Sequence, residues 1–424
     1  MKILLINKFL YPKGGDAIST LNTGRLLRLK GHKVLYWGMD HPLNREYSHK
    51  NSFVTYVDFN TSGAINKQIK MALNILYSLE AKRKVEKIVC AEKPDLVHLN
   101  NFAHQISPSI IHVFKKYNIP TVMTMHDYKL VCGSYTLLSK NGICELCKNG
   151  KFYNCLFECC VKDSRVKSFL NMVEMYLHHK ILHIYDFIDI FIAPSMFLEM
   201  KLREMGFKGE VLYLPNFVNL DGCTPGNNGT EKDIVYFGRL SKEKGLFTLI
   251  DAMKGVKGVG LKIIGEGPIK EDLERKVEVF GCKNIRFLGY KTGEGLKNEV
   301  RKSVAVVVPS ECFENNPLSV IEGFSLGKPA IGARIGGIPE LAKDNETGLT
   351  FEPGSADDLR SKIEYLIERP EKIIEMGKNA RDFVERHLSA ERHYERLMEI
   401  YECAVRSRND RLAQKDWPKR KEMV

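Results

Sequence analysis

The chain has 424 residues, of which 44% are hydrophobic and 27% are charged, and its formal net charge is +12. This length is too great for one ordinary hydrophobic core, so two domains are expected, and the composition excludes a largely disordered protein. The basic excess favours anionic partners such as nucleotides or phospholipid head groups, but a need for solubility explains it equally well.

The first residues, "MKILLINKFLYPKGGD", hold an apolar run that is too short and too charged for a signal peptide. No stretch of the sequence reaches the roughly 20 apolar residues that a membrane-spanning helix needs. We therefore expect a cytoplasmic protein, either free or peripheral on the cytoplasmic face of a membrane.

The first half alternates short β-branched runs with helical patterns, which is typical of a parallel α/β domain. Helices are predicted at residues 17–31 and 107–118. A longer helix at 67–89 has one basic and one apolar face, which favours core packing with a solvated face over contact with a membrane surface. The predicted strands are 2–7, 33–38, 53–58, 95–100, 120–126, 190–195 and 210–216.

Six of the 11 cysteines fall between residues 132 and 160. The spacing of Cys144, Cys147, Cys155 and Cys159 resembles a structural zinc site in a loop-rich insertion, which spans residues 130–165. Two alternatives are reduced, buried thiols and a redox or iron–sulfur role. Disulfides are disfavoured by the cytoplasmic placement.

Residues 217–232 are rich in Gly, Asn and Asp, as a linker would be, and a second alternation follows them. The sequence thus predicts two doubly wound α/β domains, residues 1–217 and 218–394, and a C-terminal helix, 395–424, that packs back on the first domain. The basic end of this helix, 406–424, is interpreted as a solvated tail or as attracted to anionic lipid. Strands of the second domain are predicted at 233–240, 261–267, 284–290, 304–310 and 328–334, and helices at 371–388 and 389–408.

The segment "YFGRLSKEKG" ends a predicted strand with Gly238 and Arg239, and Lys244 follows five residues later. A tight strand-to-helix turn exposes backbone N–H groups, and two cations beside it would suit a diphosphate. An ordinary basic loop is the simpler interpretation of this segment alone. Gly265, in "IIGEGP", also follows a strand and permits close backbone approach to a ligand, but it does not complete a dinucleotide-binding fingerprint.

Two glutamates, Glu314 and Glu322, are separated by seven residues in "FENNPLSVIEGF". The first lies in the loop after a strand, and the second lies in a helix that begins near Pro317. Proline costs no hydrogen bond at a first helical turn, and the N–H groups of Asn316 and Leu318 could face an anion. A carboxylate such as that of Glu322 could accept hydrogen bonds from both hydroxyls of a ribose.

These motifs together resemble the retaining glycosyltransferases of family 4, which have the GT-B architecture of two Rossmann-like domains facing across a cleft. The resemblance covers nearly the whole chain. It is specific in the second half, where the order Gly-Arg-Leu-x-x-x-Lys-Gly, then two glutamates with seven residues between them, then Gly-Gly-x-Pro-Glu is kept.

The resemblance implies that Arg239 and Lys244 clamp the diphosphate of a nucleotide-sugar donor. It further implies that Glu322 binds the ribose, that Glu314 holds the transferred sugar, and that the loop 336–340 lies near the donor. The predicted donor-binding residues are Gly14, Gly15, Gly238, Arg239, Lys244, Gly265, Asn316, Pro317, Leu318 and Glu322.

In the first domain, "YPKGGD" matches the glycine loop of the family, so Gly14 and Gly15 would let the backbone approach the sugar and phosphate. His126 ends a predicted strand, where family members carry a histidine that contacts the transferred sugar. A lone histidine is otherwise more often a structural residue. The predicted catalytic residues are His126, Arg239, Lys244 and Glu314.

The resemblance also implies the chemistry, which is transfer of a hexosyl group with retention of the anomeric configuration. The acceptor hydroxyl would lose its proton to the departing phosphate, so no dedicated base is named. No Asp-x-Asp pair occurs, and we expect no cofactor in catalysis. The expected partners are a nucleotide-diphosphate sugar, a glycan or lipid-linked acceptor of cell-surface polysaccharide or glycolipid synthesis, and an anionic membrane surface.

Two other functions are alternatives to transfer. One is a sugar-nucleotide epimerase of similar two-domain shape, and the other is a nucleotide-binding scaffold whose cysteine-rich module binds a partner. Nucleic acid is disfavoured as a partner, and none is expected, because the sequence has no basic aromatic stripe and no nucleic-acid-binding motif.

Overall fold

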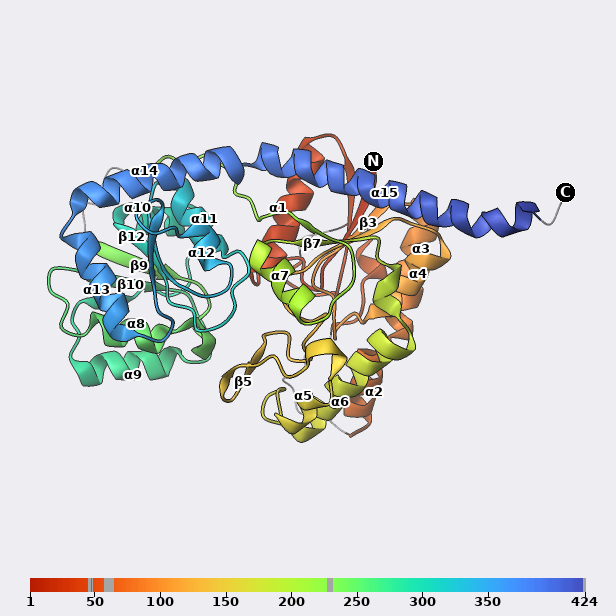
Figure 1. Ribbon diagram of the computed structural model, residues 1–424, viewed down its shortest axis with the longest axis horizontal. Helices are drawn as coiled ribbons and strands as arrows, with labels where there is room; N and C mark the ends of the chain where they lie inside the picture. The colour runs from red at the N-terminus through yellow and green to blue at the C-terminus, as the bar shows by residue number, and fades with distance from the viewer. Residues whose placement is uncertain (45–46, 48, 57–64, 227–231, 422–424) are drawn as a thin grey trace. The chain divides into compact units, whose positions relative to one another are not determined.

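The computed structural model describes residues 1–44, 47, 49–56, 65–226 and 232–421. The chain forms two compact units. Unit 1 comprises Met1–Pro194, Leu198–Leu214 and Tyr394–Val424, and unit 2 comprises Ser195–Phe197 and Pro215–His393. Figure 1 shows that each unit has a sheet with helices packed around it.

The sheet of unit 1 has six parallel strands in the order β2-β1-β3-β4-β7-β8. The four central strands are buried along nearly their whole length, as expected for a parallel sheet covered on both faces. The strands are β1 (Lys2–Ile6), β2 (Lys33–Trp37), β3 (Leu96–Leu99), β4 (Thr121–Thr124), β7 (Ile190–Ala193) and β8 (Val211–Tyr213).

The helices of unit 1 include the one predicted at the N-terminal glycine loop. They are α1 (Gly15–Leu29), η1 (Lys50–Ser52), α2 (Ile65–Leu76), α3 (Leu79–Glu92), η2 (Pro108–Ile110), α4 (Ile111–Lys116), η3 (Lys148–Gly150), α5 (Asn154–Phe157), α6 (Arg165–Tyr176), η4 (Leu177–Ile181), η5 (Ile184–Phe187) and α7 (Met196–Glu204). A small hairpin, β5 (Leu138–Ser139) and β6 (Gly142–Ile143), lies within the cysteine-rich stretch.

Two predictions for the first half need correction. The strand predicted at 53–58 is absent from residues 53–56, where Val54 makes only an isolated bridge with Met39, and the rest of this prediction lies outside the described residues. The helix predicted at 67–89 is two helices, α2 and α3. The chain breaks before Ser78, whose hydroxyl accepts a hydrogen bond from the Ala81 N–H (3.1 Å) and caps α3.

The C-terminal helix α15 (Ala390–Lys421) belongs to unit 1 from Tyr394 onward. Two buried polar contacts fix it there. The Tyr401 hydroxyl lies 2.8 Å from Nδ1 of His98, and the Arg408 guanidinium donates to Asp189 at 2.7 Å. A buried ion pair leaves an uncompensated charge when one partner moves away, so these contacts specify where the helix packs.

Unit 2 has a second six-stranded parallel sheet, in the order β11-β10-β9-β12-β13-β14. Five strands match the predictions, and β14, at the edge, was not predicted. The strands are β9 (Asp233–Phe237), β10 (Gly260–Ile264), β11 (Ile285–Phe287), β12 (Ala305–Val308), β13 (Ala330–Ala333) and β14 (Gly348–Phe351). The helices are η6 (Lys242–Lys244), α8 (Leu246–Met253), α9 (Lys270–Phe280), α10 (Gly293–Lys302), α11 (Leu318–Ser325), α12 (Ile338–Leu341), α13 (Ala356–Ile367) and α14 (Pro370–His387).

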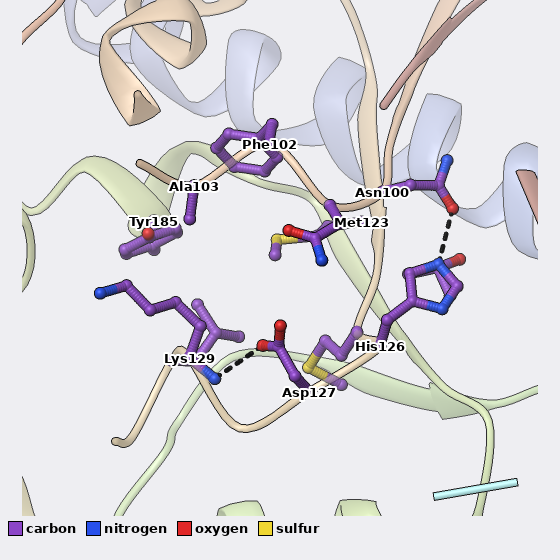
Figure 2. Close-up of a pocket in the computed structure, with 12 residues that line it drawn as sticks. Asn100, Phe102, Ala103, Met123, His126, Asp127, Lys129 and Tyr185 are labelled. Carbon is purple, nitrogen blue, oxygen red and sulfur yellow. Dashed lines mark hydrogen bonds between the residues drawn. The ribbon is translucent and has the colours of Figure 1, made fainter. Parts of the chain in front are cut away.

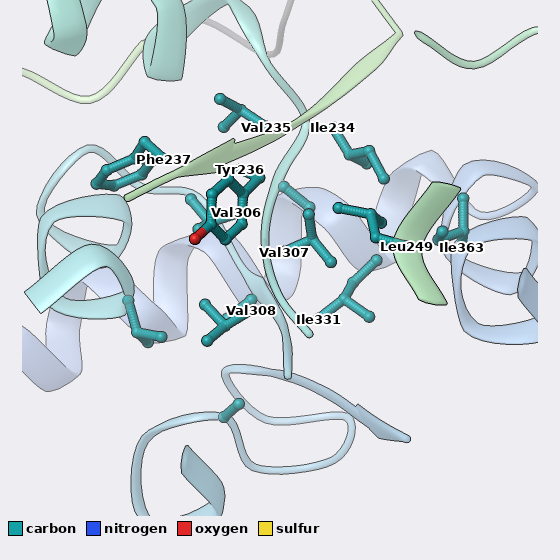
Figure 3. Close-up of a cluster of buried hydrophobic side chains, with 14 of the residues drawn as sticks. Ile234, Val235, Tyr236, Phe237, Leu249, Val306, Val307, Val308, Ile331 and Ile363 are labelled. Carbon is teal, nitrogen blue, oxygen red and sulfur yellow. The ribbon is translucent and has the colours of Figure 1, made fainter. Parts of the chain in front are cut away.

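The core of unit 2 lies between these strands and helices. Figure 3 shows side chains of the central strands, such as Val307 and Ile331, beside Leu249 of α8 and Ile363 of α13. All four are completely or almost completely buried, and each contributes roughly 1.5–3 kcal/mol of burial free energy. This core holds the carboxyl ends of β9, β10 and β12, where ligands of open parallel sheets bind. None of the helices in the described ranges combines the length and the apolar character of a membrane-spanning segment.

Candidate functional site

Two glycine turns meet at the carboxyl edge of the unit 2 sheet. Gly238 follows β9, and its N–H donates to the carbonyl of Ile264 at 3.0 Å. Gly265 follows β10 with φ +145°, and a Cβ placed on it would lie 1.9 Å from the carbonyl oxygen of Gly238. Gly265 therefore has no room for a side chain at this contact, and the two turns meet backbone to backbone. The approach of a ligand to this backbone stays a prediction.

A third glycine, Gly245, connects η6 to α8. Its φ is +67°, and a Cβ would lie 1.8 Å from the carbonyl oxygen of Pro309, which follows β12. This contact fixes the loop after β9 against the loop after β12. The two loops carry Lys244 and Glu314, so the glycine sets the distance between these side chains.

Replacing Gly245 by alanine should therefore lower the free energy of unfolding by about 2–4 kcal/mol, because a left-handed backbone and a backbone collision add. Gly255→Ala is the matched control, since Gly255 also has a positive φ (+84°) but nothing within 4 Å of a Cβ. We expect the control to cost only about 1 kcal/mol. Chemical denaturation of both variants measures the difference, and equal losses would contradict a tight contact at Gly245.

Lys244 and Glu314 form an ion pair. The Nζ of Lys244 lies 2.5 Å from Oε1 of Glu314, and the Ser310 hydroxyl donates to the same oxygen at 2.7 Å. Burial would raise the pKa of Glu314, but the Lys244 charge and these hydrogen bonds lower it below its usual value. Burial would likewise lower the pKa of Lys244, and Glu314 raises it. Both groups are therefore charged at neutral pH.

Arg239 is an exposed cation at this edge. Its backbone is fixed, because its carbonyl oxygen accepts a hydrogen bond from the Tyr236 hydroxyl at 2.7 Å. Its guanidinium makes no ion pair or hydrogen bond with any side chain in the described part of the chain. A fixed backbone with a free guanidinium suits bidentate binding of a phosphate.

Glu322 lies on the second turn of α11, a helix that begins after Pro317. Burial raises the pKa of this carboxyl to about 7. Within the described ranges no residue donates a hydrogen bond to it. A half-buried carboxylate without donors is costly, which is typical of a group whose partner is a ligand.

The chain just before α11 is held by paired asparagines. The N–H of Asn216 donates to Oδ1 of Asn316, and Nδ2 of Asn216 donates to the Asn316 carbonyl, both at 2.9 Å. The side chain of Asn316 is thus used inside unit 2, so donor binding by Asn316, Pro317 and Leu318 would have to use their backbone. That role stays a prediction.

The loop Gly336–Glu340 packs directly against the backbone of Glu314. The N–H of Gly337 donates to the Glu314 carbonyl at 2.7 Å, and a Cβ on Gly336, with φ +62°, would lie 2.3 Å from the same oxygen. The two glycines therefore set the position of Glu314, and they do not by themselves line an open space.

Unit 1 carries its own cavity at the ends of β3 and β4, with a volume of about 20 Å³, enough for one hydroxyl group or water. Figure 2 shows His126 beside Asn100 at this cavity. The Nε2 atom of His126 lies 2.9 Å from Oδ1 of Asn100. Burial lowers the pKa of His126, so the ring is neutral. A carbonyl oxygen only accepts hydrogen bonds, so Nε2 donates to Asn100 and Nδ1 is an acceptor.

Asp127, which the sequence analysis did not single out, lies inside this cavity (Figure 2). Burial raises the pKa of its carboxyl, and the N–H of Lys129 donates to it at 2.9 Å. Its position directly after His126, at a strand end, was a usable signal in the sequence. A carboxylate beside a neutral imidazole is suited to accept hydrogen bonds from hydroxyl groups.

The loop that carries His126 is held in place by a buried cluster of charged and polar side chains around Lys129. The ammonium of Lys129 donates to Oε2 of Glu174 (2.6 Å) and to Oδ1 of Asn171 (2.9 Å), both on α6, and lies 3.0 Å from Nε2 of His104. Glu174 is fully buried, and Lys129 and His104 hold its pKa well below the usual range. The ammonium of Lys129 thus has all its hydrogen-bond partners within the protein. The hydrophobic pattern of the sequence did not indicate this cluster.

The predicted glycine loop lies at the same edge. Gly15 is the first residue of α1, Gly14 caps it in extended conformation, and the charge of Asp16 acts on His126. The side-chain amide of Asn7, after β1, accepts a hydrogen bond from the Asn101 N–H at 2.9 Å. Unit 1 therefore brings Gly14, Gly15 and His126 to one end of its sheet.

The four cysteines predicted to bind zinc, Cys144, Cys147, Cys155 and Cys159, are not gathered into a metal-binding group in the described structure, and the zinc site stays a prediction. Cys155 is hydrogen-bonded to Cys160, and the Cys159 thiol contacts the Leu156 carbonyl at 3.7 Å. Burial raises the pKa of Cys147 to about 12, which disfavours the thiolate. Across the described ranges, no group of three or more His, Cys, Asp or Glu side chains is arranged to hold a metal ion, and all described cysteines are free thiols.

The predicted residues thus form one group in each unit. Unit 2 carries its predicted residues in the segments that follow β9, β10 and β12: Gly238, Arg239, Lys244, Gly265, Glu314 and Glu322. Unit 1 brings together Gly14, Gly15 and His126. The predicted roles of these residues in binding and catalysis remain predictions.

Comparison with known proteins gives two family matches in succession. Residues 13–221 match the family described as "Glycosyltransferase Family 4", and residues 224–383 match "Glycosyl transferases group 1". A relative from Methanocaldococcus jannaschii, an uncharacterised glycosyltransferase, is 26% identical over 384 residues, which cover 90% of this chain and 93% of the relative.

Solved structures with the same fold cover 95% of this chain. A sucrose-phosphate synthase from Thermosynechococcus elongatus has a TM-score of 0.70 at 19% identity, with 98% of its own chain covered. The Anabaena protein HepE, in complex with UDP-glucose, has a TM-score of 0.67 at 17% identity, with 99% of its chain covered. These structures share the two-domain GT-B fold with the present chain.

Proposed function

The chain belongs to glycosyltransferase family 4, and on that premise we propose that it is a retaining hexosyltransferase. In this proposal unit 2 binds a nucleotide-diphosphate sugar, and the sugar passes to a hydroxyl group on a glycan or lipid-linked acceptor. Cell-surface polysaccharide or glycolipid synthesis is the proposed setting, and the cytoplasmic face of a membrane is the proposed location.

The observation that carries the proposal is the state of Glu322. Its carboxylate is half-buried on the first turns of α11, its pKa is raised to about 7, and within the described chain it has no hydrogen-bond donor. The two hydroxyls of a ribose are a matching pair of donors. Their hydrogen bonds would offset the cost of burying the carboxylate.

The diphosphate would lie beside Arg239 and Lys244, at the bare backbone of the glycine turns. Cleavage of the anomeric bond places negative charge on the leaving phosphate, and fixed cations stabilise that charge. Arg239 is available for this role, since its guanidinium has no partner within the described residues. Lys244 would share its ammonium between Glu314 and the phosphate.

The acceptor side is proposed to be the cavity of unit 1. Neutral His126 and the carboxylate of Asp127 can both accept hydrogen bonds from hydroxyl groups. Lys129, the lysine that lines the cavity, is held by Glu174 and Asn171 and so is not free for a phosphate. The acceptor proton would leave with the departing phosphate, so no protein base is required.

Donor binding is tested by thermal unfolding of the whole protein with UDP-, GDP- and ADP-sugars. A ligand that binds only the folded state adds about 2.7 kcal/mol of stability at 100 times its Kd. HepE binds UDP-glucose, so UDP-sugars are the first members of the panel. We expect one nucleotide to raise the Tm by several degrees, and no rise with any of them would contradict a nucleotide-sugar site.

The stabilising donor then separates transfer from epimerisation. Incubation with the donor and a mixture of glycan and lipid-linked acceptors should give a glycosylated product with the anomeric configuration of the donor. An epimerase would instead alter the sugar or release it without any acceptor.

A further inference from the structure

Helix α6 has the reverse of the usual amphipathic pattern. Its buried positions are mainly polar, with Ser168, Asn171 and Glu174 facing the protein interior. Its exposed positions include Val166 (79% exposed) and Phe169 (52% exposed), which are three residues apart and so share one face. A surface helix ordinarily exposes its polar face, so the exposed apolar side chains of α6 indicate a surface that binds another molecule.

The neighbouring elements extend this apolar face. Helices α5 and α2 both pack against α6, and Figure 1 shows the three together at one end of unit 1. Helix α5 exposes Phe157 (74%), and α2 exposes Leu73 (60%). Among the described residues, eight exposed large apolar side chains lie between residues 135 and 181: Tyr135, Ile143, Leu146, Tyr153, Phe157, Val166, Phe169 and Ile181.

Single exposed apolar side chains are normal, but a group of them on adjacent helices marks an interaction surface. Unit 2 provides a contrast. The described part of its main segment, Pro215–His393, exposes only Val279, Tyr290 and Ile374 among large apolar side chains, and they lie far apart in the sequence.

Cations accompany the apolar side chains. Lys151, Arg165 and Lys167 are exposed, and none of them makes an ion pair with a described residue. Arg165 and Lys167 flank Val166 on the first turn of α6. Two acids lie on this stretch: Asp163 is exposed and paired with Lys140 at 3.3 Å, and Glu158, next to Phe157, is partly buried and makes no ion pair with a described residue. The three unpaired cations therefore outnumber the one unpaired acid. The surface is thus apolar at its centre and positive at its border.

We propose that this surface, formed by α6, α5 and the exposed side of α2, docks on an anionic lipid bilayer. Val166, Phe169 and Phe157 would enter the boundary between head groups and acyl chains, while Arg165 and Lys167 contact anionic head groups. A bilayer fits both features, whereas a neutral apolar partner would leave the border cations without counter-charges. The docking does not depend on the donor or on the reaction.

The test is co-sedimentation of the full-length protein with two kinds of vesicle. One is an equal mixture of phosphatidylglycerol and phosphatidylcholine, and the other is phosphatidylcholine alone. We expect strong binding to the anionic vesicles, at least 10-fold weaker binding to the neutral ones, and loss of binding as salt rises. Equal binding to both vesicles would overturn the proposal.

The double variant Val166→Asp/Phe169→Asp should bind anionic vesicles at least 10-fold more weakly. Val279→Asp is the matched control, since Val279 is 82% exposed on α9 of unit 2, and it should bind like the wild type. The basic C-terminal tail is unchanged in both variants, so wild-type binding by the double variant would assign lipid binding to the tail and overturn the role of α6.

Two further measurements keep the result interpretable. The changed side chains are exposed, so both variants should keep the wild-type Tm. The oligomeric state is measured by light scattering, because a wild-type dimer that the double variant converts to a monomer, without vesicle binding, would show that the surface joins two copies of the chain.

Discussion

Lys244→Ala is expected to lower kcat/KM by about 10³-fold, the largest effect of any single substitution at the unit 2 edge. A fixed cation beside a leaving phosphate contributes several kcal/mol to transition-state stabilisation. The ammonium of Lys244 lies 2.5 Å from Glu314, so its position is set before any ligand binds. Steady-state kinetics with the stabilising donor measures the loss, and a change below about 10-fold would contradict the proposed role.

The same substitution should lower the free energy of unfolding by about 2 kcal/mol. Glu314 would lose its counter-charge while Ser310 keeps its hydrogen bond, and a buried carboxylate without a cation is costly. Lys242→Ala is the matched control, because Lys242 lies on the same short helix, η6, and is exposed. It should leave both activity and stability nearly unchanged.

A double variant separates the two effects. Lys244→Ala/Glu314→Gln removes both charges, so much of the lost stability should return, while activity stays at the level of Lys244→Ala or lower. Recovery of activity in the double variant would mean that Lys244 only neutralises Glu314 and does not act on the donor.

Strand and helix order could be predicted from the sequence wherever burial was complete. The segments 233–240 and 304–310 each contain an uninterrupted run of apolar residues that includes β-branched ones. These runs form β9 and β12, as predicted. The edge strand β14 (Gly348–Phe351) was missed, because four residues of mixed type carry little periodicity. The break between α2 and α3 was missed because Ser78 was not recognised as a helix cap.

The part of the candidate site that could be predicted from the sequence consists of residues that lie close together along the chain. The loop that carries Gly238, Arg239 and Lys244 is a short segment, and the spacing of its cations follows from the turn itself. The pairing of Lys244 with Glu314 joins residues 70 positions apart and depends on the contact of Gly245 with Pro309. Such a contact has no signature within either segment.

The cluster around Lys129 shows a different limit. Its partners Asn171 and Glu174 lie on a helix whose polar face is buried, against the usual pattern, so hydrophobic periodicity assigns that face to solvent. The same reversal exposes Val166 and Phe169. Because α6 buries its polar face, its hydrophobic pattern predicted neither the ion pair of Glu174 with Lys129, which supports the His126 loop, nor the exposed apolar surface.

Glu322→Gln should weaken donor binding and stabilise the unliganded protein. A carboxylate bound to two ribose hydroxyls contributes about 1.5–3 kcal/mol through charge-assisted hydrogen bonds. Its replacement should therefore raise the KM for the donor by about 10- to 100-fold at pH 8. The retained folding of the variant distinguishes this loss from damage to the structure.

The stability gain has a definite pH dependence. Burial raises the pKa of Glu322 from 4.5 to about 7, so the folded protein holds a proton that the unfolded chain releases between these values. The stability of the wild type relative to the glutamine variant therefore falls as pH rises from 4.5 to 7. The variant should match the wild type at pH 4 and exceed it by about 1–3 kcal/mol at pH 8.

Urea denaturation at pH 4, 6 and 8 measures this difference, and Glu278→Gln, an exposed position on α9, is the control. The donor should reverse the order at pH 8, because it stabilises the wild type more than the variant. A variant that is less stable than the wild type at every pH, with or without donor, would show that Glu322 has a structural role and is not a ligand-binding residue.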